Sequence, residues 1–188
     1  MARKYEPTKP ARFVVETVDG VEQIRIRARR NWLVIAFLLF WLSMWTMGGG
    51  ATIFALIAHF EPFMLLWLAG WAVAWLFVAA TIAWQLTGAE TLRVVGSDLE
   101  IGHGIAGFAR RRLFRGSDIS GMAAEGASDP FSRMYSAYPP FLNRARTGSV
   151  KFSYGARTIH AAAGLDEGEG RLIVEHLRRR LPLSAVAP

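Results

Sequence analysis

The side chains that most often carry chemistry are sparse in this chain of 188 residues, which has four histidines and no cysteine. The lack of cysteine excludes disulfides, thiolate metal sites, iron–sulfur clusters and thiol catalysis. No serine, histidine and acid are arranged to present a nucleophile. The nearest approach to a metal motif is His59 with Glu61, a pair suited only to an exposed ion. We therefore expect no enzyme, no cofactor and no metal centre.

His59 also ends an Ala55-x-x-x-His59 spacing within an apolar run. This spacing resembles the chlorophyll-ligating helices of light-harvesting polypeptides, in which an imidazole binds the central magnesium. The resemblance makes His59 a candidate for pigment ligation. The alternative is an ordinary histidine at the edge of a loop.

The stretch Gly102–Gly107 matches the G-x-G-x-x-G pattern of dinucleotide-binding loops. In such a site a helix follows the loop, and its N-terminus holds the pyrophosphate. The residues that follow, Phe108 to Phe114, include three consecutive arginines and have neither an N-cap nor helical periodicity. We interpret the stretch as a glycine-rich hairpin turn and not as a nucleotide site.

The densest basic segment comes directly after this stretch. It consists of Arg110, Arg111, Arg112 and Arg115. Arginine forms bidentate hydrogen bonds with phosphate, so the segment is a candidate site for anionic head groups or for a peptide. The alternative is a basic face that lies against a membrane without a specific ligand. No pattern of interleaved aromatic and basic residues predicts nucleic-acid binding.

Two apolar runs predict the elements that position these residues. Between Asn31 and Glu90 the chain has no lysine or arginine and a single acid, Glu61. The runs at residues 32–58 and 63–86 are each long enough to cross the ~30 Å hydrocarbon core of a bilayer. We expect the first to be one tilted helix that continues through Gly48–Gly50, because membrane helices tolerate glycine. The short connection predicts an antiparallel transmembrane hairpin within residues 31–88.

Basic residues determine the expected orientation of this hairpin. Residues 1–31 have eight lysines and arginines, the connecting loop has none, and the segment after Leu86 has fourteen. The positive-inside rule therefore predicts a bacterial inner-membrane protein with both termini in the cytoplasm. The charged N-terminal stretch is too long for a signal peptide. Three arginines before the first helix are expected to contact anionic lipids, namely Arg27, Arg29 and Arg30.

Tryptophans form a stripe along the second predicted helix. Trp67, Trp71 and Trp75 follow one another at intervals of four residues, so they share one helical face. The stripe could pack on the first helix, where Trp41 and Trp45 form a matching pair. It could instead face lipid or the helix of a partner protein. By contrast, Trp32 and Trp84 are expected at the edges of the membrane, where interfacial tryptophans gather.

An aromatic insertion at residues 126–147 is the most unusual stretch of the chain. Its candidate contact residues are Phe131, Tyr135, Tyr138 and Phe141. Disordered segments are poor in aromatic residues, whereas the cores of protein interfaces are rich in them. We expect the insertion to bind a partner protein, with membrane contact or coverage of its own domain as the alternatives.

The remaining segments predict a β-rich cytoplasmic domain. Residues 1–30 contain an N-terminal tail and two β-prone runs around Asp19-Gly20, which is a strong hairpin signal. An isolated hairpin is marginally stable, so we expect it to join strands from residues 89–188. A C-terminal amphipathic helix is predicted at residues 167–181, capped by Asp166 with Glu169 at the capping-box position.

Three sequence features resemble those of a known group of proteins. They are the junction Trp84…Gly88-Ala89-Glu90-Thr91-Leu92, the strand pair Phe152-x-Tyr154-Gly155-x-x-Thr158, and the helix start Gly164-Leu165-Asp166-Glu167. Together they resemble small bacterial inner-membrane proteins with two transmembrane helices and a pleckstrin-homology-like (PH-like) cytoplasmic domain. The resemblance implies an antiparallel β domain with a C-terminal helix, and a non-enzymatic role.

These expectations lead to two hypotheses for function. In the first, the chain is an accessory or assembly subunit of a larger respiratory or photosynthetic membrane complex, and it docks through the aromatic insertion and the tryptophan stripe. In the second, its PH-like domain binds anionic lipid head groups or a peptide through the basic segment.

Overall fold

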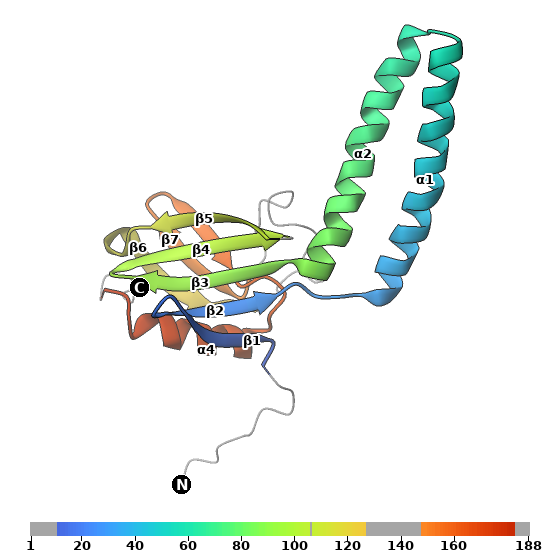
Figure 1. Ribbon diagram of the computed structural model, residues 1–188. Helices are drawn as coiled ribbons and strands as arrows, with labels where there is room; N and C mark the ends of the chain where they lie inside the picture. Colours follow the sequence, from blue (N-terminus) through green and yellow to red (C-terminus); the bar gives the residue numbers. More distant parts are fainter. Residues whose placement is uncertain (1–10, 106, 127–147, 183–188) are drawn as a thin grey trace.

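The computed structural model describes residues 11–105, 107–126 and 148–182. A long helical hairpin projects from one end of a β domain (Figure 1). The chain forms two strands, leaves the sheet to build the hairpin, and returns to the same sheet beside the strand that it left. The predicted combination of two long apolar helices, antiparallel strands and a C-terminal helix is therefore confirmed.

The larger sheet has five antiparallel strands in the order β1-β2-β3-β4-β5. The strands are β1 (Phe13–Val18), β2 (Val21–Arg27), β3 (Ala89–Val95), β4 (Asp98–Ile105) and β5 (Phe108–Phe114). Asp19 and Gly20 connect β1 to β2 with φ of 53° and 74°, as a hairpin turn with two left-handed residues requires. Because β2 pairs with β3, the prediction that this hairpin joins later strands is confirmed.

The helical hairpin consists of α1 (Trp32–Ala58) and α2 (Pro62–Thr87). The side chain of Asn31 caps α1 by accepting a hydrogen bond from the N–H of Val34. The helix continues without interruption through Gly48–Gly50, as predicted. Pro62 occupies the first turn of α2, so this helix begins one residue before the predicted start and ends one residue after the predicted end.

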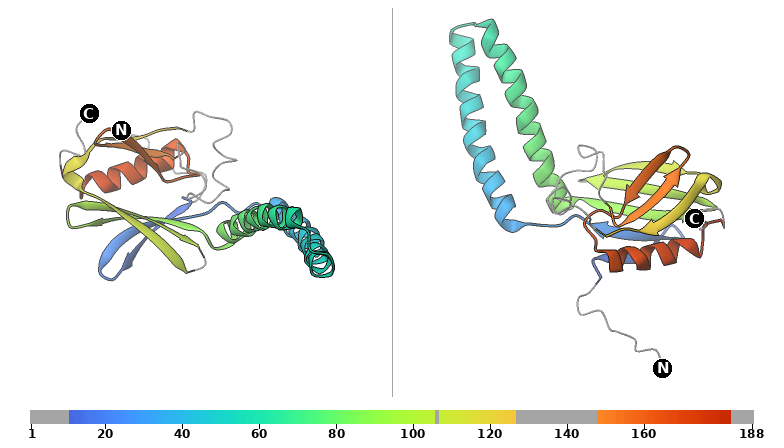
Figure 2. Two further views of the ribbon diagram at one scale, coloured as in Figure 1. Left: turned by 90° about the horizontal axis from the view of Figure 1, so that it is seen from above. Right: turned by 180° about the vertical axis from the view of Figure 1, so that it is seen from behind.

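A smaller sheet faces the larger one. It has the order β6-β7-β8, formed by β6 (Ile119–Ala124), β7 (Val150–Tyr154) and β8 (Arg157–Ala161), and a short 3-10 turn, η1 (Gly116–Asp118), precedes it. Leu92 and Leu99 of the larger sheet and Ile119 and Phe152 of the smaller one belong to one buried core. The two sheets therefore form two layers around a shared interior (Figure 2).

Helix α4 (Glu167–Arg178) closes the side of these layers that lies away from α1 and α2 (Figures 1 and 2). Asp166 and Glu169 form the predicted capping box. Glu169 also binds the side chain and the backbone N–H of Arg12, which fastens the start of β1 to the start of α4. The predicted end at residue 181 is wrong, because the helix stops at Arg178 and a turn before Pro182 keeps Leu181 buried.

Two further expectations are corrected. Gly102 and Gly104 lie inside β4 and not in a turn, since each pairs with residues of β3 and β5, and the chain reverses only after Ile105. Trp84 is 4% exposed and is not an interfacial residue. β3 follows α2 after a single residue, Gly88, where a Cβ would overlap the Trp84 ring.

The junction between the hairpin and the sheet is held by hydrogen bonds from the segment that connects β2 to α1. The N–H of Ala28 donates to the carbonyl of Gly88 over 2.9 Å. The guanidinium of Arg30 donates to the carbonyl of Leu86 over 2.9 Å, and the N–H of Asn31 donates to the side chain of Gln85 over 3.3 Å. These bonds satisfy carbonyls at the end of α2 and orient the sheet relative to the two helices.

Candidate functional site

The edge strand β5 holds the densest basic segment of the chain. It lies on the side of the larger sheet toward which α1 and α2 extend, whereas β1 forms the opposite edge (Figures 1 and 2). Ala89, the first residue of β3, pairs with Gly104, and Ile105 pairs with Phe108. The start of β5 is therefore at the end of the sheet where α2 enters it.

Among the described residues of the β domain, Phe108 is the most exposed large apolar one, with 85% of its surface accessible. It follows Gly107, whose φ of 87° permits the tight reversal from β4. Exposed aromatic residues beside basic ones are typical of segments that contact the membrane interface. This residue was not singled out from the sequence, since only the register shows that it lies at the end of the sheet next to α2.

Alternation along β5 separates its three consecutive arginines into two groups. Arg110 pairs with His103 and Arg112 pairs with Ile101, so these two arginines are on the face of the sheet that carries the core. Arg111 pairs with Gly102 and points to the opposite face. All three residues are exposed, and of the residues of β5 only Phe114, at its far end, belongs to the buried core.

Arg111, on the outer face of the sheet, which is the face away from the core, has an acidic neighbour. Arg111 Nε is 3.6 Å from Glu100 Oε1. Glu100 in turn accepts two hydrogen bonds from Arg93 over 2.8 and 3.0 Å. These hydrogen bonds raise the pKa of the Arg93 guanidinium above its usual value. The outer face therefore has its own charge network, which partly neutralises Arg111.

The inner-face arginines have no such network. Within the described ranges, no ion pair or hydrogen bond joins Arg110 or Arg112 to a carboxylate. The cross-strand neighbour of Arg110 is His103, whose Nε2 is 3.8 Å from Glu90 Oε1. Glu90 is itself buried and accepts hydrogen bonds from the backbone N–H groups of Ala162 and Ala163. Two exposed guanidiniums and one imidazole thus share this face.

The other predicted basic residues are separated from this group. Arg115 follows β5 at the opposite end of the strand from Phe108 and is exposed. Arg27 ends β2, Arg29 is exposed in the connection to α1, and Arg30 binds the end of α2. Arg27, Arg29 and Arg30 therefore lie near the base of the helices, whereas Arg115 is at the other end of β5 from Arg110.

The tryptophan stripe is divided between the hairpin interior and its surface. Trp71 lies against Gly49 of α1, and its ring centre is 6.2 Å from that of Trp45. Trp75 Nε1 donates a hydrogen bond to Thr46 Oγ1 over 2.9 Å. Trp67, nearer the loop, is 47% exposed. Two members of the stripe therefore hold α1 and α2 together, which was one of the alternatives drawn from the sequence.

His59 is at the tip of the hairpin, far along the chain from the basic strand. It is the C-cap residue of α1, its N–H donates to the carbonyl of Ala55, and its side chain is exposed. Across the part of the chain that the structure describes, no three histidine or acidic side chains gather as they would around a metal ion. His59 therefore remains a single exposed imidazole beside Glu61.

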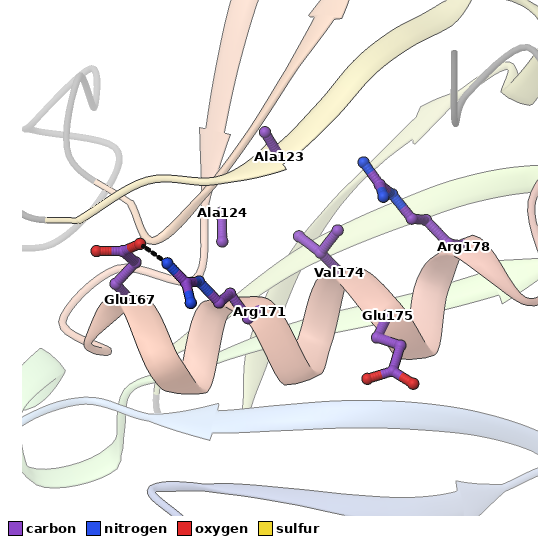
Figure 3. Close-up of a pocket in the computed structure, with 7 residues that line it drawn as sticks. All are labelled: Ala123, Ala124, Glu167, Arg171, Val174, Glu175 and Arg178. Atoms are coloured by element: carbon purple, nitrogen blue, oxygen red, sulfur yellow. Dashed lines mark hydrogen bonds and ion pairs between the residues drawn. The ribbon is translucent and has the colours of Figure 1, made fainter. Parts of the chain in front are cut away.

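A groove of about 340 Å³ lies between β6 and α4. Val174 points from α4 toward Ala123 and Ala124, whereas Glu175 points to the other side of the helix (Figure 3). The charged groups of the groove are already engaged: Arg171 pairs with Glu167 over 2.5 Å, and Arg178 donates to the carbonyl of Met122. The groove thus offers few unpaired polar groups to a ligand.

The candidate contact residues of the aromatic insertion, Phe131, Tyr135, Tyr138 and Phe141, lie outside the described residues. Comparisons with known proteins add no family to these observations. No protein-family model matches the chain, and no curated protein matches it either.

Proposed function

We propose that this chain is a membrane-anchored module that binds anionic lipid head groups at the cytoplasmic face of a bacterial inner membrane. The observation that supports this proposal best is the position of β5. This strand presents exposed arginines on the side of the β domain from which the two helices rise.

The exposure of the helices supports a membrane location. Both are long and apolar enough to span a bilayer. Within an apolar 18-residue segment of each helix, only 11% of the segment in α1 and 0% of the segment in α2 is buried within the protein. A core helix of a soluble domain would be mostly buried. Helices with apolar side chains on all sides and no cover from the chain itself are stable in lipid.

The position of the basic residues supports a cytoplasmic β domain. Arg27, Arg29 and Arg30 are beside the ends of α1 and α2, and the loop at the far end of the hairpin has no basic residue. Inner-leaflet head groups are anionic and attract each basic residue near the surface by about 1 kcal/mol. With the helices in the bilayer, Phe108 would reach the interface and the arginines of β5 would meet lipid phosphates.

The same proposal includes a PH-like identity for the β domain. It is supported by two antiparallel sheets packed around one core and closed by a C-terminal amphipathic helix. The sheet of five strands includes a hairpin that precedes the membrane helices in the chain. The membrane helices would then be an insertion between two strands of the domain.

A depth measurement tests the proposed placement, and the absence of native cysteine makes it direct. The variants Phe108→Cys and Val14→Cys place one fluorophore on each edge of the larger sheet, where both native residues are exposed. In proteoliposomes with quencher-bearing lipids, we expect strong quenching at position 108 and little at position 14. The quenching at position 108 should increase with the fraction of anionic lipid. Equal quenching at both positions would contradict the proposal.

A second candidate function, an accessory subunit of a respiratory or photosynthetic complex, is favoured by unused small residues on the helices. Nothing lies within 4 Å of the position that a side chain would take at Gly48, Gly50 or Gly70. Small residues allow membrane helices to approach closely, and these three serve no contact within the hairpin. Trp67 adds an exposed aromatic contact.

This candidate predicts that a complex purified in mild detergent contains the chain in fixed stoichiometry. The variant Gly50→Leu should lose the partner while the β domain remains folded, as judged by circular dichroism. If the wild-type chain purifies alone from native membranes, the accessory role is wrong.

A further inference from the structure

We infer that Arg110, Arg112 and His103 form a binding site for a phosphate monoester on the inner face of the larger sheet. This inference rests on the proposed function, and it specifies which of the basic residues recognise a ligand and which chemical group they prefer. The other arginines near the membrane would then act through their charge alone.

The first support is the separation of Arg110 and Arg112 from the rest of the basic segment. Residues two apart in a strand lie on one face about 7 Å from each other, a distance that one phosphate group can bridge with two guanidiniums. Arg111 lies on the other face and has Glu100 as a neighbour at 3.6 Å. Two of the three consecutive arginines therefore share one face of the sheet, and the third is on the other.

The second support is the charge balance of the inner face. Arg110 and Arg112 are exposed and have no carboxylate partner within the described ranges. Among the described residues, the acid that faces His103 on this side of the sheet is Glu90, which is 4% exposed and has both oxygens occupied by the N–H groups of Ala162 and Ala163. A ligand that bridges the arginines therefore meets two uncompensated positive charges.

His103 supplies a third group on the same face. It is the cross-strand neighbour of Arg110, and about a third of its side chain, 31%, is exposed. Its Nε2 faces Glu90 at 3.8 Å, which orients the ring, and its Nδ1 has no hydrogen-bond partner among the described residues. Two arginines and one histidine therefore share one face of neighbouring positions on β4 and β5.

These donors match a phosphate monoester better than a phosphate diester. A monoester carries a charge between about −1.5 and −2 at neutral pH and has three terminal oxygens. A diester has one charge and two free oxygens, so it offers the two arginines less negative charge and the three groups fewer terminal oxygens. Phosphatidic acid is a lipid with a monoester, and glycerol 3-phosphate is its soluble counterpart. Phosphatidylglycerol is a diester lipid of the inner membrane.

Native mass spectrometry of the full-length protein in detergent tests this inference. Short-chain phosphatidic acid, phosphatidylglycerol and the zwitterionic phosphatidylcholine are added at equal concentrations, and the retained lipid is counted. We expect roughly tenfold preferential retention of phosphatidic acid over phosphatidylglycerol. The double variant R110Q/R112Q should abolish this preference, and His103→Asn should reduce it. Arg111→Gln is the matched control on the same strand, and it should keep the preference.

Addition of glycerol 3-phosphate distinguishes the two sources of the ligand. If it displaces phosphatidic acid only at concentrations at least tenfold higher than those of the lipid, the ligand is a lipid. If it binds as tightly as the lipid, the ligand is a soluble phosphate monoester. Either outcome supports the monoester site.

Two results would overturn the inference. One is equal retention of phosphatidic acid and phosphatidylglycerol by the wild-type protein. The other is an equal loss of preference in Arg111→Gln and in the double variant. Retention of both anionic lipids above phosphatidylcholine would leave the proposed head-group function in place without this site. Retention of neither would remove both proposals.

Discussion

The carboxylate of Glu90 accepts a hydrogen bond from the backbone N–H of Ala162 over 3.0 Å, and its other oxygen accepts one from Ala163 over 3.1 Å. Glu90 belongs to the larger sheet and is the third residue after α2, whereas Ala162 directly follows the last strand of the smaller sheet. Ala162 has a φ of 61°, a conformation that this pair of hydrogen bonds stabilises. One buried side chain thus joins both sheets close to the base of the helices.

We expect Glu90→Ala to destabilise the β domain by at least about 2 kcal/mol. The substitution leaves two buried or half-buried N–H groups without an acceptor, and each such group costs about 1–3 kcal/mol. It also removes the neighbour that faces His103. Chemical unfolding of the full-length protein in detergent, followed by circular dichroism in the far ultraviolet, measures this loss.

Glu175→Ala is a suitable control for this experiment. Glu175 is on the surface of α4 and pairs with Arg179, and both side chains are more than half exposed, at 65% and 72%. An exposed pair of this kind contributes less than about 1 kcal/mol. If the two variants unfold at the same denaturant concentration, Glu90 does not join the sheets as described.

Within the helical hairpin, Gly49 and Gly50 are expected to respond differently to the same substitution. A Cβ at Gly49 would overlap the ring of Trp71, whereas nothing lies within 4 Å of a Cβ at Gly50. Gly49→Ala should therefore separate the helices and destabilise the hairpin by about 1–3 kcal/mol. Gly50→Ala should have no destabilising effect, because alanine has the higher helix propensity.

Thermal unfolding in detergent with tryptophan fluorescence as the signal compares the two glycine variants. The fluorescence also reports on Trp71, whose emission should change only in Gly49→Ala. Equal melting temperatures would show that α1 and α2 do not pack at this position.

Sequence patterns predicted those elements whose signals are local. The Asp19-Gly20 turn, the apolar run from residue 32 to 58, and the capping box at Asp166 each depend on residues within a few positions of one another, and each forms as predicted. Tyr138 and its neighbours lie outside the described residues, so the prediction for the aromatic insertion stays untested.

Features that depend on pairing between distant residues could not be predicted in the same way. The sequence around Glu90 is β-prone and does not distinguish this residue from an exposed acid. Its buried carboxylate is bound by Ala162, 72 positions later in the chain. Strand alternation alone places Arg110 and Arg112 on one face and Arg111 on the other. Only the register with β4 shows which of these faces carries the core. The position of Trp84 near the end of an apolar run is typical of an interfacial residue. Its side chain is nevertheless buried, at a point where β3 follows α2 after one residue.

The capping box of α4 provides a further test of stability. Asp166 accepts a hydrogen bond from the N–H of Glu169 over 2.8 Å, and Glu169 accepts one from the N–H of Asp166. Asp166→Ala should cost about 1 kcal/mol, as is typical of an N-cap. Asp166→Asn should restore most of this stability, since asparagine is an equally good cap. Equal midpoints of chemical unfolding for wild type and Asp166→Ala would exclude a contribution of the cap.

His176 of α4 makes the stability of the β domain depend on pH. Burial lowers the pKa of His176 below its usual value of 6.5, and the neighbouring charge of Arg180 lowers it further, against an opposing effect of Glu22. Arg180 Nη1 is 2.6 Å from the Nε2 of His176, a distance that suits an arginine donating to a neutral imidazole.

The unfolded chain therefore binds a proton at this residue more readily than the folded chain does. As the pH falls through about 6.5, the unfolded state gains this proton first, so the free energy of unfolding decreases. This decrease is complete once the pH is below the folded-state pKa. His176→Gln keeps an acceptor for Arg180 and does not titrate. Chemical unfolding at pH 7.5 and pH 5.5 should show a larger loss of stability for the wild type than for His176→Gln, and the same loss in both proteins would mean that His176 is not responsible.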